Sequence, residues 1–182
     1  FNTLTTEMGS DMQAAVQWVE DEGRRTMRSA VLQGAGEHFC PGGNLHRRAG
    51  QAASSLAAGA RASIDLFAGF CRLRSLPLPV LCAAHGTVLG GGLAICLLTD
   101  HVISNERATF QVGERSRAIY PAGLLTQSLA DAMGAEAATK LYVTEAKPTA
   151  RQACEVGLVQ VVTPSTADAQ QLALEMARRY AS

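Results

Sequence analysis

The chain has 182 residues, with 16 Lys or Arg against 16 Asp or Glu, so its formal net charge is zero. This balance excludes the excess of positive charge that is typical of dedicated nucleic-acid and anionic-membrane binders. Apolar residues make up 47% and charged residues 18%, which is enough to form a core and excludes an intrinsically disordered chain. The length predicts a single domain over residues 1–182, and no apolar run reaches the ~18 residues that a membrane-spanning helix needs.

The chain begins at Phe1, without Met or a basic, apolar leader, and we therefore expect a fragment or a processed chain. Its cysteines form no CxxC pair and its histidines do not have the spacing of zinc ligands, so we expect no metal site. Scattered cysteines favour a reducing, cytoplasmic setting and a structural role for the thiols over a catalytic one. The five are Cys40, Cys71, Cys82, Cys96 and Cys154.

Hydrophobic periodicity predicts helices that alternate with short apolar strands. In chain order we expect a helix over Thr5–Glu22, a strand at Ala30–Leu32, a helix carrying Ile64 to Leu73, strands at Val80–Ala84 and His101–Ile103, helices at Leu124–Met133, Ala135–Tyr142 and Thr149–Val156, a strand at Leu158–Val162 and a helix at Ala167–Tyr180. The alanine-rich segment Arg48–Arg61 is predicted as a mobile loop that leads into a helix. The alternation predicts an α/β fold with a largely parallel sheet.

Two glycine-rich loops are the distinctive feature of the sequence. Residues 39–45 read FCPGGNL, and residues 85–94 read HGTVLGGGLA, with the glycine triplet Gly90–Gly92 before an apolar helical run at 93–98. Each loop follows an expected buried strand, which is where α/β folds place ligand sites. Glycine allows close approach of the backbone, and amides at a helix N-terminus favour negative charge. Two such loops are suited to aim two N–H donors at one oxygen, as an oxyanion hole does.

Other interpretations of the loops are weaker or remain open. The sequence contains no GxxxxGK[ST], no GxGxxG and no GxSxG, so a P-loop, a dinucleotide fingerprint and a serine nucleophile elbow are not indicated. Tight packing between a helix and a strand explains a glycine triplet equally well. From local pattern alone, this structural alternative stays open beside the oxyanion hole.

The chain resembles the enoyl-CoA hydratase/isomerase (crotonase) superfamily. Residues 39–45 are similar to that family's F-C-A-G-A-D-L motif, and residues 84–95 to its V-x-G-x-A-x-G-G-G-x-E-L motif. Residues 108–114 and 119–123 are similar to A-x-F-x-x-P-E followed by G-x-x-P-x-x-G, and residues 150–159 to A-x-x-A-x-x-x-G-L-V. The resemblance implies a crotonase-like spiral of ββα units, here partial, with the N-terminal strands and C-terminal helices missing. It also implies assembly as a homotrimer or hexamer.

The resemblance assigns roles to three positions. It implies that the amides of Gly43 and Gly91 hold a thioester oxygen and that Glu114 moves a proton. Hydratases of the family use two glutamates, but the first of those positions is Ala94 here. One remaining carboxylate matches the family's Δ3,Δ2-enoyl isomerases, which we therefore expect ahead of hydratases. The local pattern alone, with Arg115 and Arg117 close in sequence, favours instead a surface ion pair for Glu114.

The same resemblance predicts the substrate-binding residues Pro41, Gly42, Leu45, Gly90, Tyr120 and Pro121. A further departure is Asn44, which replaces the usual Asp of the first motif. His46 is expected to be a solvated loop residue, and His85 a hydrogen-bonded structural residue.

Three functions remain open. The first is proton transfer on an unsaturated acyl-CoA thioester, by isomerisation or by hydration. The second, indicated by a short likeness of residues 119–122 to polyketide branches of the superfamily, is dehydration or decarboxylation of a β-branched thioester on an acyl carrier protein. The third is a non-catalytic crotonase-fold scaffold. No cofactor is expected, because coenzyme A or phosphopantetheine is part of the substrate, and neither nucleic acid nor membrane is an expected partner.

Overall fold

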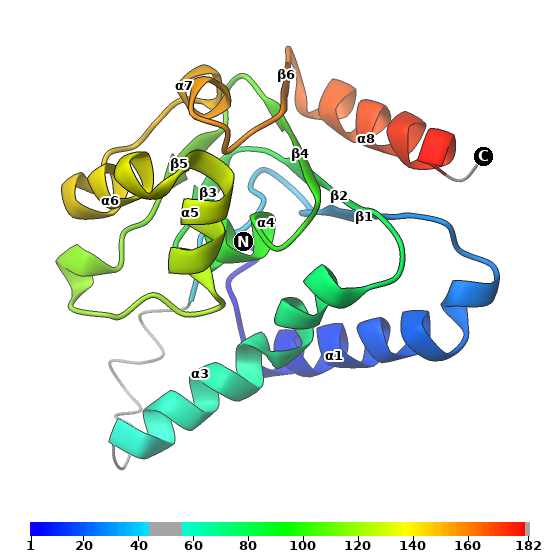
Figure 1. The fold of residues 1–182 in the computed structure, drawn as a ribbon, viewed down its shortest axis with the longest axis horizontal. Coiled ribbons are helices and arrows are strands. Elements are labelled where there is room, and N and C mark those ends of the chain that lie inside the picture. The colour runs from blue at the N-terminus through cyan, green and yellow to red at the C-terminus, as the bar shows by residue number, and fades with distance from the viewer. Residues whose placement is uncertain (44–55, 181–182) are drawn as a thin grey trace.

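A computed structural model describes residues 1–43 and 56–180 (Figure 1). The helices are α1 (Thr6–Asp21), α3 (Leu56–Cys71), α4 (Gly91–Cys96), α5 (Leu125–Met133), α6 (Ala135–Thr144), α7 (Ala150–Glu155) and α8 (Thr166–Tyr180), with 3-10 turns η1 (Gly23–Arg25), η2 (Arg72–Ser75) and η3 (Arg115–Arg117). The strands are β1 (Ala30–Gln33), β2 (Val80–Ala84), β3 (Thr87–Leu89), β4 (His101–Asn105), β5 (Thr109–Gln111) and β6 (Val161–Thr163). Helices and short strands are interspersed along the chain, although β2 and β3, β4 and β5, and the helices α5 to α7 follow one another directly.

The main sheet has four parallel strands in the order β1-β2-β4-β6. Strand β2 lies inside it, with Val80 paired to Ala30 of β1 and Leu81 paired to His101 of β4. All five residues of β2 are buried, which explains why this strand reads as an unbroken apolar run. The predicted parallel α/β arrangement is therefore confirmed.

A second, two-stranded parallel sheet is formed by β3 and β5, with Val88 paired to Phe110. Neither strand is expected from the sequence, because three residues between glycine-rich turns are too short to show a period of two. The last strand also differs from its expected position, since β6 begins at Val161 rather than Leu158. Leu158 instead donates its N–H to the Ala153 carbonyl and ends the turn of α7.

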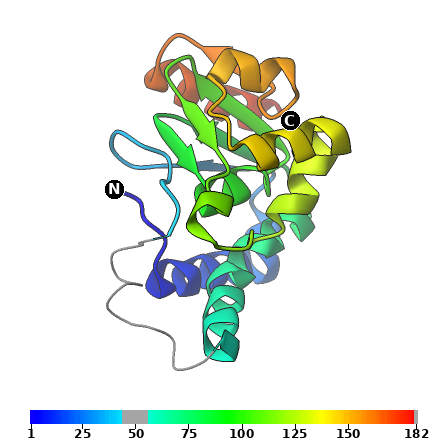
Figure 2. The ribbon, with the colours of Figure 1, turned by 90° about the vertical axis from the view of Figure 1, so that its left-hand side faces the viewer.

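Helix α8 covers one face of the main sheet. Ala169, Ala173 and Ala177, spaced four residues apart, are buried in a cluster with Leu81 and Ile103 of β2 and β4. Small side chains on this stripe let the helix lie close to the strands. Figures 1 and 2 show that α8 and the helix pair α1 and α3 occupy opposite sides of the molecule.

Helices α1 and α3 pack closely against each other. A Cβ on Gly9 would lie 2.6 Å from the Leu66 carbonyl oxygen, and one on Gly69 would collide with the backbone of Gln13. The α3 helix begins at Leu56, so the prediction of a loop as far as Arg61 is wrong at its C-terminal end. Alanine has the highest helix propensity, and the alanine-rich segment continues the helix towards its N-terminus. The rest of that predicted loop, residues 48–55, lies outside the described residues.

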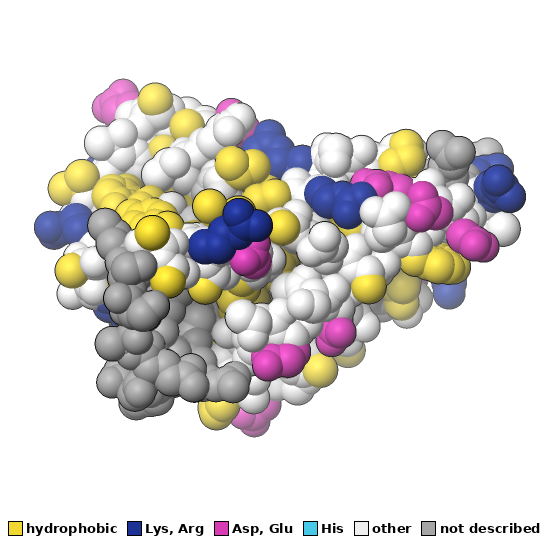
Figure 3. Space-filling view, turned by 90° about the horizontal axis from the view of Figure 1, so that it is seen from below, with side chains coloured by type: hydrophobic (Ala, Val, Ile, Leu, Met, Phe, Trp, Pro, Cys, Tyr) yellow, Lys and Arg dark blue, Asp and Glu magenta, His cyan; other side chains and the backbone are white. Residues whose placement is uncertain are grey.

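Charges of both signs are mixed on the surface. On the face in Figure 3, Lys and Arg side chains lie beside Asp and Glu side chains, and the described residues of that face show no large patch of one sign. Arg72 pairs with Glu20 and joins η2 to α1, and Arg74 pairs with Asp131 of α5 at 2.9 Å. Across residues 1–43 and 56–180, no helix is both long enough and apolar enough to span a bilayer.

Candidate active site

The first glycine loop begins as an extra strand beside β3. Cys40 forms a parallel bridge with Val88. The Cys40 N–H donates to the Thr87 carbonyl at 3.2 Å, and the Cys40 carbonyl accepts from the Leu89 N–H at 3.1 Å. These bonds attach residues 39–41 to the strand that leads directly into the second glycine loop.

Gly42 brings the two loops into contact. Its φ is +85°, and a Cβ at this position would lie 2.8 Å from the Leu89 carbonyl oxygen and 3.5 Å from the Gly91 nitrogen. Both the backbone conformation and the space therefore require glycine. The Gly42 carbonyl accepts from the Leu4 N–H at 2.9 Å, which holds the loop from its other side. Gly43, the next residue, consequently lies near the start of α4.

The glycine triplet shapes the second loop. Gly90 has φ +56° and donates its N–H to the Gln111 carbonyl at 2.9 Å, which ties the loop to β5. A Cβ on Gly92 would collide with the Cys40 carbonyl oxygen. The triplet thus serves both helix–strand packing and the close approach of the two loops. The packing interpretation of the triplet therefore does not exclude the oxyanion-hole interpretation.

Two amides at this junction have no protein acceptor among the described residues. Gly91 lies in the first turn of α4, where N–H groups have no partner within the helix. Gly43 is exposed, and a Cβ on it would meet nothing within 4 Å. Neither N–H donates to any group within residues 1–43 and 56–180. Adjoining loops with unpaired amides match the chemistry of an oxyanion hole, which stabilises a developing negative oxygen.

The Glu114 carboxylate lies against the same loop. Its side chain is only 8% exposed, and its Oε1 would be 2.9 Å from a Cβ on Gly90. Its Oε2 is buried and has no hydrogen-bond partner in the described part of the chain. The nearby Arg117 guanidinium donates to the Gly113 carbonyl. The local sequence suggests an exposed surface ion pair for Glu114. In the structure Glu114 is instead a buried acid beside the glycine triplet.

Burial raises the pKa of Glu114 from 4.5 to about 7. Its own backbone N–H and the positive charge of Arg117 act in the opposite direction, while the negative charge of Glu145 adds to the rise. A carboxyl group that titrates near neutral pH is suited both to accept a proton and to return it.

The position of the missing second carboxylate is apolar. Ala94 is fully buried, and its Cβ would lie 3.3 Å from a Cβ on Gly123. The Phe67 ring from α3 reaches both sides of this position, because its carbons would lie 2.9 Å from a Cβ on Gly91 and 2.6 Å from one on Gly123. Leu4 would touch the same Cβ on Gly91 at 2.6 Å. This part of the site is therefore lined by hydrocarbon.

Sequence pattern alone does not indicate that Leu4 and Phe67 lie at the site. Leu4 is remote in sequence from both motifs, and Phe67 belongs to an ordinary helical stripe. Gly91 gives the one indication, because a glycine has no side chain and the space beside it must be filled by side chains from other elements.

The predicted substrate-binding residues are placed differently from one another. Gly42 and Gly90 are buried at the loop junction and Pro41 is half-buried beside them. Tyr120 is 58% exposed, and the half-buried Pro121 follows it, beyond η3. Leu45 lies outside the described residues, as do Asn44 and His46.

The other nucleophilic and titratable groups near the loops are buried. His85 Nε2 lies 3.0 Å from the Gly36 carbonyl oxygen, consistent with a structural role, although its Nδ1 has no partner among the described residues. The Cys82 and Cys96 sulfurs are 3.7 Å apart. Burial raises the pKa of the Cys40 thiol to about 11, so this thiol stays protonated near neutral pH.

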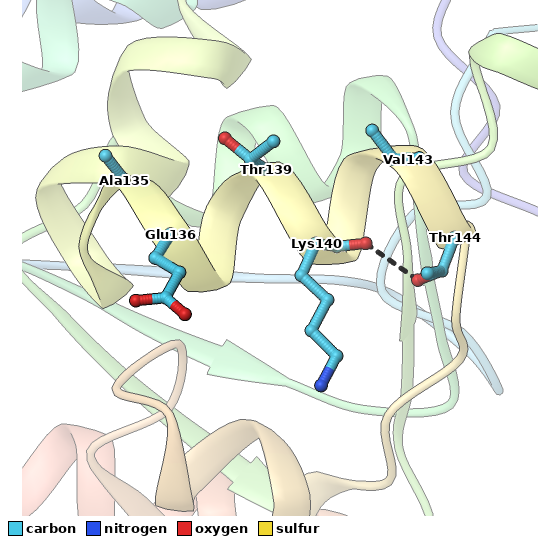
Figure 4. Close-up of a pocket in the computed structure, with 6 residues that line it drawn as sticks. All are labelled: Ala135, Glu136, Thr139, Lys140, Val143 and Thr144. Atoms are coloured by element: carbon cyan, nitrogen blue, oxygen red, sulfur yellow. Dashed lines mark hydrogen bonds between the residues drawn. The ribbon is translucent and has the colours of Figure 1, made fainter.

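A surface pocket of about 570 Å³ lies elsewhere, on α6 (Figure 4). Glu136 and Lys140 point to one side of the helix, and Thr139 and Val143 point to the other. No residue of the two glycine loops lines it, and Glu114 does not either. Among the described residues, no group of three or more His, Cys, Asp or Glu side chains is arranged to hold a metal ion.

Comparison with known proteins shows which family this chain is similar to. The family model described as Enoyl-CoA hydratase/isomerase matches residues 1–182. The Bacillus subtilis protein YngF, whose name refers to the same family, is 34% identical over 164 residues, which cover 89% of this chain and 61% of YngF. The 2,3-dehydroadipyl-CoA hydratase of Escherichia coli is 29% identical over 97% of this chain and 66% of its own. This chain thus spans less than two thirds of either relative.

Solved structures show the same fold. The crystal structure of an enoyl-CoA hydratase from Bacillus anthracis matches with a TM-score of 0.90 and 30% identity, over 98% of this chain and 67% of that one. The parallel sheets and the helices define a crotonase fold. The chain belongs to the enoyl-CoA hydratase/isomerase family.

Proposed function

We propose that this chain carries the site of an enzyme that shifts the double bond of a 3-enoyl-CoA thioester to the 2-position. The observation that carries the proposal is Glu114, the single buried carboxylate among the described residues, which lies against the glycine triplet while position 94 is alanine. One acid that both removes and returns a proton is sufficient for isomerisation. The relatives support an enoyl-CoA substrate only as a class, because the chain covers part of their length.

The proposed reaction needs two proton transfers at one carboxylate. Ionised Glu114 takes a proton from C2, and the electrons of the broken C–H bond form the dienolate, whose charge collects on the thioester oxygen. The Gly43 and Gly91 N–H groups donate to that oxygen. Protonated Glu114 then returns the proton to C4, so that the double bond lies between C2 and C3 and the carboxylate is restored. Loss of one such donor costs about 3–4 kcal/mol in comparable sites.

The apolar surroundings of Ala94 favour this reaction over hydration. Adding water across a double bond requires the water to be held and deprotonated, and the family resemblance assigns that work to two carboxylates. Here the methyl group of Ala94 and the ring of Phe67 offer no hydrogen bond. Water at this side of the site would therefore lack a polar partner.

Hydration is the second candidate, because the relatives include proteins named hydratases. The two reactions are separated by incubating the protein with a 3-enoyl-CoA and, separately, with the matching 2-enoyl-CoA. We expect 2-enoyl product from the first substrate and little 3-hydroxyacyl product from the second. Comparable rates of 3-hydroxyacyl formation would refute the argument from one carboxylate.

Glu114→Gln tests the role of the acid directly. We expect turnover to fall by at least the 10²–10⁴-fold that general acid–base catalysis typically contributes. Unchanged turnover would show that Glu114 is not the base. Turnover of an acyl-carrier-protein thioester but not of the CoA ester would instead support the polyketide alternative, and absence of turnover in the parent protein would support the scaffold. A homotrimeric or hexameric assembly and a cytoplasmic location stay predictions.

A further inference from the structure

Glu145 adopts an unusual backbone conformation at the end of α6. Its φ is +50°, in the left-handed region that glycine normally fills, and it is one of three non-glycine residues with positive φ among the described residues. The Glu145 N–H donates to the Leu141 carbonyl at 3.0 Å and closes the helix. This conformation costs a residue with a Cβ free energy that glycine would avoid.

That interaction reaches the segment that carries Glu114. The Glu145 Oε1 accepts from the Ser116 N–H at 2.9 Å. Ser116 lies in the middle of η3, which begins immediately after Glu114 and whose first N–H groups have no partner within the turn. The Glu114 carbonyl in turn accepts from Arg117 N–H at 3.2 Å and from Ile119 N–H at 3.0 Å. Glu145, at the end of α6, thus binds the η3 turn, and the Glu114 carbonyl accepts hydrogen bonds from residues in and after that turn.

The charges around this junction are few. Within the described residues, the positive charge of Arg117 and the negative charge of Glu145 act on the Glu114 carboxylate, in opposite directions. The Ser116 backbone N–H, the Ser116 side chain and Arg115 hold the pKa of Glu145 below its usual range, so it remains ionised when Glu114 titrates. A fixed negative charge near a buried acid disfavours ionisation of that acid.

We infer that Glu145 is a positioning residue for Glu114, because its carboxylate holds the η3 turn that follows Glu114. This inference rests on the proposed function for its catalytic meaning. The contact itself, however, is testable without turnover, because it concerns the titration of one carboxyl group.

Three variants separate the parts of this role. Glu145→Gln keeps a hydrogen-bond acceptor for Ser116 but removes the charge. Glu145→Gly removes both and relieves the backbone strain, so the folded state is expected to melt at the same or a higher temperature. Glu136→Gln, which removes an exposed carboxylate from the same helix, is the matched control. The Glu114 carboxyl is followed by ¹³C NMR, with Glu114→Gln used to assign its resonance, and turnover of a 3-enoyl-CoA is measured in parallel.

We expect the midpoint of the Glu114 titration to move to lower pH in both Glu145 variants and to stay in place in Glu136→Gln. Glu145→Gly should lose about tenfold to a hundredfold in kcat while its melting temperature holds, because a displaced acid is a poor base. A Glu114 titration that is the same in all variants would overturn the inference. If Glu114→Gln is inactive while Glu145→Gly has parental kcat and titration, the inference alone fails. If Glu114→Gln keeps parental turnover, the proposed function fails, and a shifted titration in the Glu145 variants would still support the contact.

Discussion

A Glu114→Gln variant should change how the stability of the folded protein depends on pH. In the folded state the pKa of Glu114 is raised from 4.5 to about 7, so ionising this group opposes folding. Below pH 4.5 Glu114 is neutral in the folded and the unfolded state, and its contribution to the free energy of unfolding is fully present. This contribution is lost as the pH rises through about 7. Glutamine has no such ionisation and keeps nearly the same shape.

The size of the effect follows from the shift. Each unit of pKa difference corresponds to about 1.4 kcal/mol, so the whole shift is worth up to about 3 kcal/mol above pH 8. Glu114 is largely buried, with 8% of the residue exposed, and solvent screening reduces this figure. We expect the stability of Glu114→Gln relative to the parent to increase by about 1–3 kcal/mol between pH 5 and pH 8.5.

Chemical denaturation at pH 5 and pH 8.5 measures this change. The free energy of unfolding of Glu114→Gln relative to the parent is compared at the two pH values. Any pH-independent cost of burying the amide cancels in this comparison. Glu136→Gln, with the same substitution on the exposed surface of α6, controls for the loss of one negative charge. If the difference between Glu114→Gln and the parent were the same at both pH values, burial would not raise the pKa of this carboxyl group. The site would then contain no Glu114 carboxyl group that titrates near neutral pH.

Three further predictions concern the loops, the core and the reaction. Gly42→Ala places a Cβ 2.8 Å from the Leu89 carbonyl oxygen at φ +85°, so we expect a loss of about 1–3 kcal/mol, measured by thermal melting; an unchanged melt would contradict the strained contact. Leu81→Ala empties space under α8 at a fully buried position and should cost about 2–5 kcal/mol in urea denaturation, and a cost below 1 kcal/mol would show that the helix closes the gap. For the proposed isomerisation, kcat should rise with pH through about 7, as Glu114 ionises, whereas a rate that falls over this range would identify a required acid instead.

The sequence predicts best those parts of the fold that repeat a regular pattern. Helix α1 and strand β2 lie within one or two residues of their expected ends, because one has a clear helical stripe and the other an unbroken buried run. Strands β3 and β5 are too short to carry a period. The start of α3 is misjudged because alanine and glycine together suggest a loop, while the helix propensity of the alanines continues the helix.

For the site, the loop motifs predict which residues matter but not what surrounds them. Gly43, Gly91 and Glu114 follow from the resemblance, whereas the local charges near Glu114 suggest an exposed ion pair that the structure does not contain. Phe67 and Gly91 are 24 positions apart in the sequence, and Glu145 and Ser116 are 29 positions apart. No local pattern encodes such pairs, since only the packing of separate elements brings them together.

The contact of Gly92 with the Cys40 carbonyl has a consequence for the timing of the reaction. Because a side chain as small as a methyl group would not fit between the loops, neither loop can shift far without displacing the other. For the proposed reaction, the entropy of holding the two amides in place would therefore be lost when the chain folds, before the thioester binds. Binding should need no slow closing step at this point, and the donors should already be preorganised when charge develops on the oxygen.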